Sequence, residues 1–147
     1  MSNAVAGSLN TLLADSTVFY QKLRHYHWNV QGPRFFELHA KFEEIYEKWA
    51  PFVDQIAERI IALDAVPLHT LAGMLEHATL KEDAELRDGT EMVNRTIADL
   101  TALRESMNGI IGEAEKAGDR TTANLLDDIG DAAEGDVWML KAWLKRA

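Results

Sequence analysis

Three of the five histidines in this chain fall within one short stretch, HYHWNVQGPRFFELH, at positions 25 to 39. His27 and His39 lie on either side of Gly32-Pro33, a pair that ends a helix because proline cannot continue its hydrogen bonding. A turn here brings the two histidines to the same end of a helix pair. Imidazole nitrogen is a good ligand for Fe(II) and similar metals, although a single histidine is more often a packing residue.

Acidic residues follow on the next predicted helix. On a helical wheel with Leu38 at zero, the apolar stripe stays within about 40° of the origin, which marks the core face. Four polar residues fall between about 100° and 200°, pointing away from the core: His39, Glu43, Asp54 and Glu58. Taken alone, an Asp54-Glu58 pair usually marks a solvated face.

Apolar residues share that outer sector, namely Phe36, Ala50, Ala57 and Ile61. A purely solvated face does not need them, so the pattern predicts a partner subunit. His39 and Asp54 are 15 residues apart, or about 22 Å of helix, so one chain cannot bring them to one metal. Two such helices, packed antiparallel about a two-fold axis near residue 48 or 49, place His39 opposite the partner's Glu58.

Apolar residues recurring at steps of three and four predict four long helices and no strand. The patterns cover residues 5–30, 38–63, 86–114 and 122–144, with a short helix near 70–77. Leu86 opens the third pattern, Asp119 is the expected N-cap of the fourth, and Trp138 lies beside its core stripe. The long connection between the second and third helices predicts an all-α four-helix bundle with a crossover, formed by residues 1–147 as a single domain.

Composition narrows the class of protein. No cysteine occurs, so any metal is held by His, Asp and Glu. The formal net charge of −9 argues against general nucleic-acid binding and suits either cation attraction or simple solubility. Residues before Lys22 carry no Lys or Arg, and no apolar run approaches the ~20 residues of a membrane span, so we expect a cytoplasmic protein outside the membrane.

These residues together resemble a known family. The run His27-Trp28-Asn29-Val30, then Gly32, Phe35, Leu38-His39, Asp54 and Ala57-Glu58-Arg59, closely resembles the signature of the Dps family, or miniferritins. The resemblance implies a ferritin-like bundle, assembled as a hollow homododecamer from two-fold dimers. It also implies that Fe(II) is oxidised, preferentially by hydrogen peroxide, and stored inside as a ferric mineral.

The resemblance assigns residues to roles. It implies a di-iron ferroxidase site shared between two subunits. One subunit supplies His27 and His39, and its two-fold mate supplies Asp54 and Glu58. Glu43 would steady a water or His39 from just outside the site. Trp28 resembles a tryptophan kept near this site in the family, with packing or electron donation as its role.

Iron must also reach the cavity. In the family, acidic three-fold pores form around the start of the last helix, where this chain offers Asp119, Asp127, Asp128 and Asp131. The same acids also fit a helix start facing water, which leaves both roles open.

Two other function classes stay in view. A DNA-condensing nucleoid protein with secondary iron binding is one, but residues 1–21 lack the Lys-rich tail that DNA-condensing members commonly carry, and Lys141, Lys145 and Arg146 are few. A helical scaffold whose dimer face holds no metal is the other.

Overall fold

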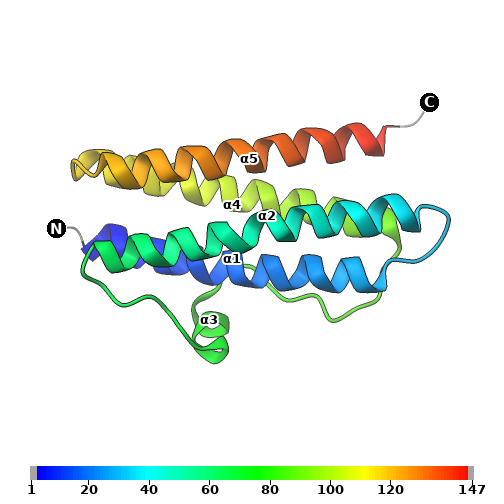
Figure 1. The fold of residues 1–147 in the computed structure, drawn as a ribbon, viewed down its shortest axis with the longest axis horizontal. Coiled ribbons are helices and arrows are strands. Elements are labelled where there is room, and N and C mark those ends of the chain that lie inside the picture. Colours follow the sequence, from blue (N-terminus) through cyan, green and yellow to red (C-terminus); the bar gives the residue numbers. More distant parts are fainter. Residues whose placement is uncertain (1–2, 146–147) are drawn as a thin grey trace.

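The computed structural model describes residues 3–145 and places five helices along them. These are α1 (Asn3–Asn29), α2 (Phe35–Ala62), α3 (Leu71–His77), α4 (Gly89–Lys116) and α5 (Arg120–Leu144). Four long helices lie side by side, and the short α3 projects from the connection between α2 and α4 (Figure 1). No strand occurs in the described part of the chain, so the predicted all-α bundle with a crossover is confirmed. Arg146 lies outside the described residues.

Apolar side chains from all four long helices meet in one core. α1 packs chiefly on α2, and α4 chiefly on α5, so the bundle consists of two helical hairpins. Large aromatic residues fill the first hairpin, with Phe19 meeting the ring of Trp49 edge-on at 5.1 Å between centroids. This burial of apolar surface is the main stabilising term for such a bundle.

Asp88 sets the start of α4. Its carboxylate accepts a hydrogen bond from the main-chain N–H of Glu91, which satisfies one of the free donors at the helix start. The helix therefore begins at Gly89, and its buried stripe begins at Met92. Leu86, which opened the predicted pattern, lies before the cap and is 76% exposed, so its assignment to the core stripe was wrong.

The long connection is tied to α1 by hydrogen bonds to polar side chains of that helix. The side chain of Asn10 donates to the carbonyl of Val66 and accepts from the N–H of Leu68. The carboxylate of Asp15 accepts from the N–H groups of Thr79 and Leu80. Further along, the phenol of Tyr26 donates to Asp83 at 2.7 Å. Buried polar groups need such partners, and here they fix the path of an otherwise irregular segment.

No helix within residues 3–145 has the length and apolarity needed to cross a membrane.

Candidate metal centre

His27 and His39 face each other across the turn between α1 and α2. Gly32 in this turn has a φ of +103°, a conformation that glycine adopts without strain. The two imidazole rings stack with centroids 3.8 Å apart and planes 15° apart. The turn therefore brings together two histidines that the sequence placed at one end of a helix pair.

Each histidine is oriented by the main chain of the other. His27 Nδ1 lies 2.7 Å from the carbonyl oxygen of His39, and His39 Nδ1 lies 2.7 Å from the carbonyl oxygen of His27. A carbonyl accepts only, so both Nδ1 atoms carry the proton and donate. In the neutral form of each ring, Nε2 then keeps a free lone pair and can bind a metal.

Glu43 lies beside this pair. Its Oε1 is 4.0 Å from His27 Nε2, which is too long for a direct hydrogen bond. Metal bonds to nitrogen and oxygen of about 2.0–2.2 Å each would together span such a gap. Glu43 is thus close enough to contact a cation, or a water on it, at His27.

Aromatic rings enclose the two histidines. Phe35 stacks on His39 at 4.7 Å, and Tyr46 meets His27 edge-on at 5.4 Å. His27 is only 8% exposed. Burial, together with the charges of Glu43 and Glu47, raises the pKa of Tyr46, so its phenol stays neutral at ordinary pH. These aromatic rings therefore pack against the imidazoles without adding charge.

Asp54 and Glu58 lie elsewhere on α2. Both are exposed, and the 15-residue offset from His39 to Asp54 corresponds to about 22 Å of helix. Within the described residues, no three His, Asp or Glu side chains gather closely enough to hold one metal. A single chain thus brings His27 and His39 together, with Glu43 near His27 alone, and leaves the predicted carboxylate ligands apart.

The other histidines have separate partners. His25 Nε2 lies 3.0 Å from the carbonyl of Glu85, on a different side of α1. His69 and His77 bond nearby main-chain carbonyls through Nδ1. These contacts hold the three histidines by main-chain carbonyls away from the His27-His39 pair.

Exposed hydrophobic side chains lie on the outer side of α1, α2 and α3. On α2 they are Phe36, 84% exposed, and Ile61, 57% exposed, both in the sector that the helical wheel assigned to a partner. Trp28 on α1 is 55% exposed, with the guanidinium of Arg24 5.0 Å from its ring. Leu71 and Leu75 extend the apolar surface on α3. Exposed apolar groups in this number indicate a protein contact surface.

Polar contacts that the sequence analysis missed join α2 to α5. Near the start of α2, Trp143 donates to Glu37 at 2.6 Å. Near its middle, the fully buried carboxylate of Asp136 pairs with Lys48 at 3.0 Å. The only sign of this pair in the sequence was an acidic residue, Asp136, on the side of α5 that carries the apolar stripe.

A third contact joins the far end of α2 to α5. Arg59 donates from Nε to Thr122 Oγ1 and from Nη2 to Asp119 Oδ1, each at 2.9 Å. Although burial opposes it, hydrogen bonds from Thr122 and the nearby Arg59 charge hold the pKa of Asp119 below its usual range. Asp119 therefore caps α5, as predicted, and is engaged in an ion pair.

The remaining candidates for an iron-uptake pore behave differently. Asp127, Asp128 and Asp131 are exposed on α5 and make no ion pair within the described residues. Their carboxylates are free to meet cations, whereas that of Asp119 is not.

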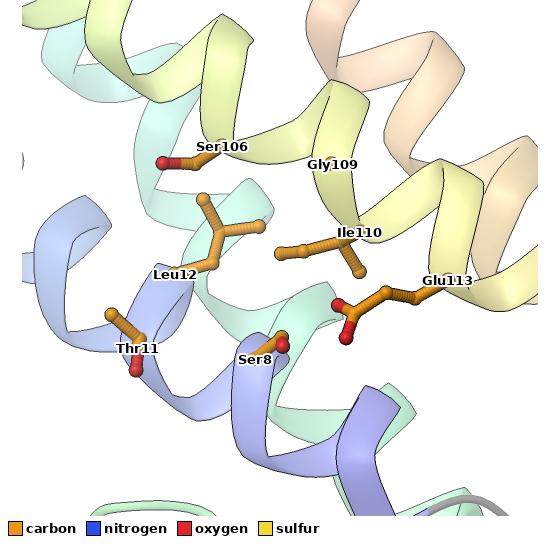
Figure 2. Close-up of a pocket in the computed structure, with 7 residues that line it drawn as sticks. All are labelled: Ser8, Thr11, Leu12, Ser106, Gly109, Ile110 and Glu113. Atoms are coloured by element: carbon orange, nitrogen blue, oxygen red, sulfur yellow. The ribbon is translucent and has the colours of Figure 1, made fainter.

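A hollow of about 360 Å³ opens between α1 and α4, away from the histidines. Figure 2 shows its walls, with Ser8, Thr11 and Leu12 from α1 facing Ser106, Ile110 and Glu113 from α4. Glu113 is the one carboxylate in this lining, and no histidine lines it. A single carboxylate does not make a transition-metal site, so the candidate metal centre is the His27-His39 pair.

The sequence of the whole chain is similar to those of known proteins. A family profile described as a ferritin-like domain matches residues 6–147. The DNA protection during starvation protein of Brevibacillus brevis is 40% identical over 96% of this chain and 95% of its own length. General stress protein 20U of Bacillus subtilis is 40% identical over 98% of this chain and 99% of its own length.

Solved structures agree with these sequence matches. The crystal structure of a Dps protein from Bacillus brevis has a TM-score of 0.95 and 39% identity, over 99% of this chain and all of that one. The Dps protein from Vibrio cholerae O1 has a TM-score of 0.93 and 43% identity, over 96% of this chain and 89% of that one. That protein is described as a member of a broad superfamily of ferritin-like diiron-carboxylate proteins.

Proposed function

This chain belongs to the Dps family of ferritin-like proteins, and we propose that it is a cytoplasmic ferroxidase that stores iron in a dodecameric cage. Its substrate is Fe(II), its preferred oxidant is hydrogen peroxide, and its product is a ferric mineral. The observation that carries this proposal is the His27-His39 pair, whose two Nε2 atoms are held ready for a metal. Imidazole and carboxylate ligands together suit Fe(II).

The other half of each site comes from a second copy of the chain. In an antiparallel contact of two α2 helices centred between residues 48 and 49, paired positions add up to 97. His39 then faces the partner's Glu58, and Glu43 faces the partner's Asp54. The same register sets the exposed Phe36 against the partner's Ile61, the two exposed large hydrophobic residues of α2. One geometry thus covers the exposed apolar side chains of α2 and completes two equivalent metal sites.

The reaction follows from this ligand set. Two Fe(II) ions give one electron each to hydrogen peroxide, which takes up two protons and leaves as two water molecules, while both irons become Fe(III). Transfer of both electrons at one site avoids release of a hydroxyl radical. His27, His39 and the partner's Asp54 and Glu58 bind the ions, and the few protein ligands leave positions open for peroxide.

Protection of the cell follows from the same chemistry. Fe(II) and peroxide are removed together, so the stress and starvation roles in the names of the relatives require no contact with DNA. Exposed acids on α5, namely Asp127, Asp128 and Asp131, are the proposed path by which the cation enters.

Stopped-flow measurement of Fe(II) oxidation tests the proposal. With peroxide as oxidant, wild-type protein should oxidise added Fe(II) faster than the His27→Ala, His39→Ala double variant, by about 100-fold at limiting iron. The matched control is His25→Ala, because His25 lies nearby but bonds the connection rather than the site. Equal rates for wild type and the double variant would exclude a ferroxidase site at this pair.

A further inference from the structure

Pro51 divides α2 into two parts. It lies within the helix, and proline has no N–H to donate to the carbonyl four residues earlier. Helices bend most readily at such a position. His39 and Glu43 lie on the part before Pro51, whereas Asp54 and Glu58 lie on the part after it, residues 52–62. The carboxylate ligands are therefore carried by a segment that a weakened joint separates from the histidines.

Each side of the joint has its own polar attachment to α5. Lys48, one turn before Pro51, pairs with the buried Asp136. After the joint, Arg59 makes the only ion pair from residues 52–62 within the described part of the chain. Its partners form a closed ring, because Thr122 also donates to Asp119, from its N–H at 3.1 Å and its hydroxyl at 2.6 Å.

The hydrogen-bonded ring of Arg59, Thr122 and Asp119 opposes rotation of residues 52–62, which apolar packing alone opposes weakly. Ile56 and Ile60 bury their side chains and keep the segment against the bundle. Apolar contact is non-directional, however, so it opposes displacement more strongly than rotation of the helix. A forked guanidinium held at two fixed acceptors is directional and opposes rotation. Glu58 is the next residue to Arg59, so a rotation of this segment would turn Glu58 and Asp54 away from the metal.

We propose that Arg59 and Asp119 are positioning residues that hold the Asp54-Glu58 half of the iron site in register across the Pro51 joint. The inference rests on the proposed function, since it requires Asp54 and Glu58 to bind iron. Neither positioning residue contacts the metal.

The test uses intact assemblies of five variants, the fifth being Glu58→Gln. Arg59→Gln removes the fork, and Asp119→Asn keeps a good N-cap but loses the charge. Arg104→Gln is the matched control, because Arg104 also reaches α5, pairing with Glu134 at 2.6 Å, but from α4. Pro51→Ala with Arg59→Gln restores the missing hydrogen bond donor at the joint. Light scattering confirms assembly, anaerobic Co(II) titration followed by visible absorption reports metal affinity, and oxidation kinetics separate KM from kcat.

We expect Arg59→Gln and Asp119→Asn to weaken Co(II) affinity and raise KM for Fe(II) by about tenfold, with little change in kcat. Arg104→Gln should leave both unchanged, and Pro51→Ala should recover most of the loss caused by Arg59→Gln. The inference is overturned if intact Arg59→Gln assemblies match Arg104→Gln, or if Pro51→Ala recovers nothing. Glu58→Gln distinguishes the two levels: if it too has no effect on Co(II) affinity, the proposed function fails as well.

Discussion

His27 and His39 are each bound through Nδ1 to the main-chain carbonyl of the other, at 2.7 Å in both directions. This reciprocal arrangement fixes both tautomers before any metal arrives. The bonds join the last turn of α1 to the first turns of α2, so the same contacts close the helical hairpin and prepare the ligands. Half of the proposed site is therefore rigid within a single chain.

The reciprocity predicts that the two histidines act as one unit. His27→Ala and His39→Ala should each lower the rate of Fe(II) oxidation by about 100-fold, and the double variant should be little worse than either. The reason is that a site lacking either histidine already binds iron poorly, and the remaining ring also loses its stacking contact, although its Nδ1 bond to the main-chain carbonyl stays. Stopped-flow rates of the three variants at equal protein concentration give the result; multiplicative losses would show that the residues act independently.

A charge exchange tests the register of the subunit contact. If Phe36 faces the partner's Ile61, Phe36→Lys alone should break the two-fold contact, because it places an unpaired charge against an apolar side chain. Adding Ile61→Glu should restore assembly, since each Lys then meets the partner's Glu. Size-exclusion chromatography with light scattering measures the mass of each variant.

The control for this exchange is Val66→Glu in place of Ile61→Glu. Val66 is also exposed, at 73%, but lies beyond the end of α2 and outside the register. Rescue of Phe36→Lys by Val66→Glu as well would mean that general charge balance, and not the register, controls assembly.

Asp83 predicts how stability depends on pH. Although burial alone would raise it, hydrogen bonds from Arg87 and Tyr26 hold the pKa of Asp83 well below its usual range. In the unfolded chain the Asp83 carboxylate takes up a proton near pH 4, whereas in the folded chain it does so only at lower pH. The free energy that Asp83 contributes to folding is therefore full at neutral pH and is lost as the pH falls below about 4. Asp83→Asn should destabilise the protein by about 2 kcal/mol at pH 7, and by progressively less below pH 4.

Guanidinium unfolding midpoints at fixed protein concentration measure this difference. Glu85→Gln serves as the control, because the Glu85 carboxylate is exposed and lies 3.8 Å from Arg87. A deficit of Asp83→Asn that stays constant down to pH 3 would contradict the assignment.

Much of the fold could be predicted because apolar spacing encodes which face of each helix is buried. The stripe from Leu38 to Ile60 is buried as expected, and the outer sector containing Phe36 and Ile61 is exposed. Periodicity does not locate a helix start as well, since that depends on a cap. Leu86 fitted the spacing but lies before the cap at Asp88, and Trp138 lies beside the core stripe yet is 69% exposed.

Contacts between side chains far apart in the sequence could not be predicted. The pairing of Lys48 with Asp136 joins residues 88 positions apart, and no local pattern signals it. In the structure a Cβ at Gly130 would overlap the guanidinium of Arg104, so its small size makes room for that side chain. The histidine pair was predictable because one short turn joins its two members.

Mixed assemblies test the shared site most directly. One subunit type carries His27→Ala and His39→Ala, the other carries Asp54→Ala and Glu58→Ala, and the two are co-expressed with different tags and purified through both. In random mixtures half of the two-fold pairs contain one subunit of each type, and each such pair regains one intact site of its two. A site shared between subunits predicts about a quarter of the wild-type rate of Fe(II) oxidation from mixtures of two inactive variants. Mixed assemblies as inactive as either parent would contradict a site shared between subunits.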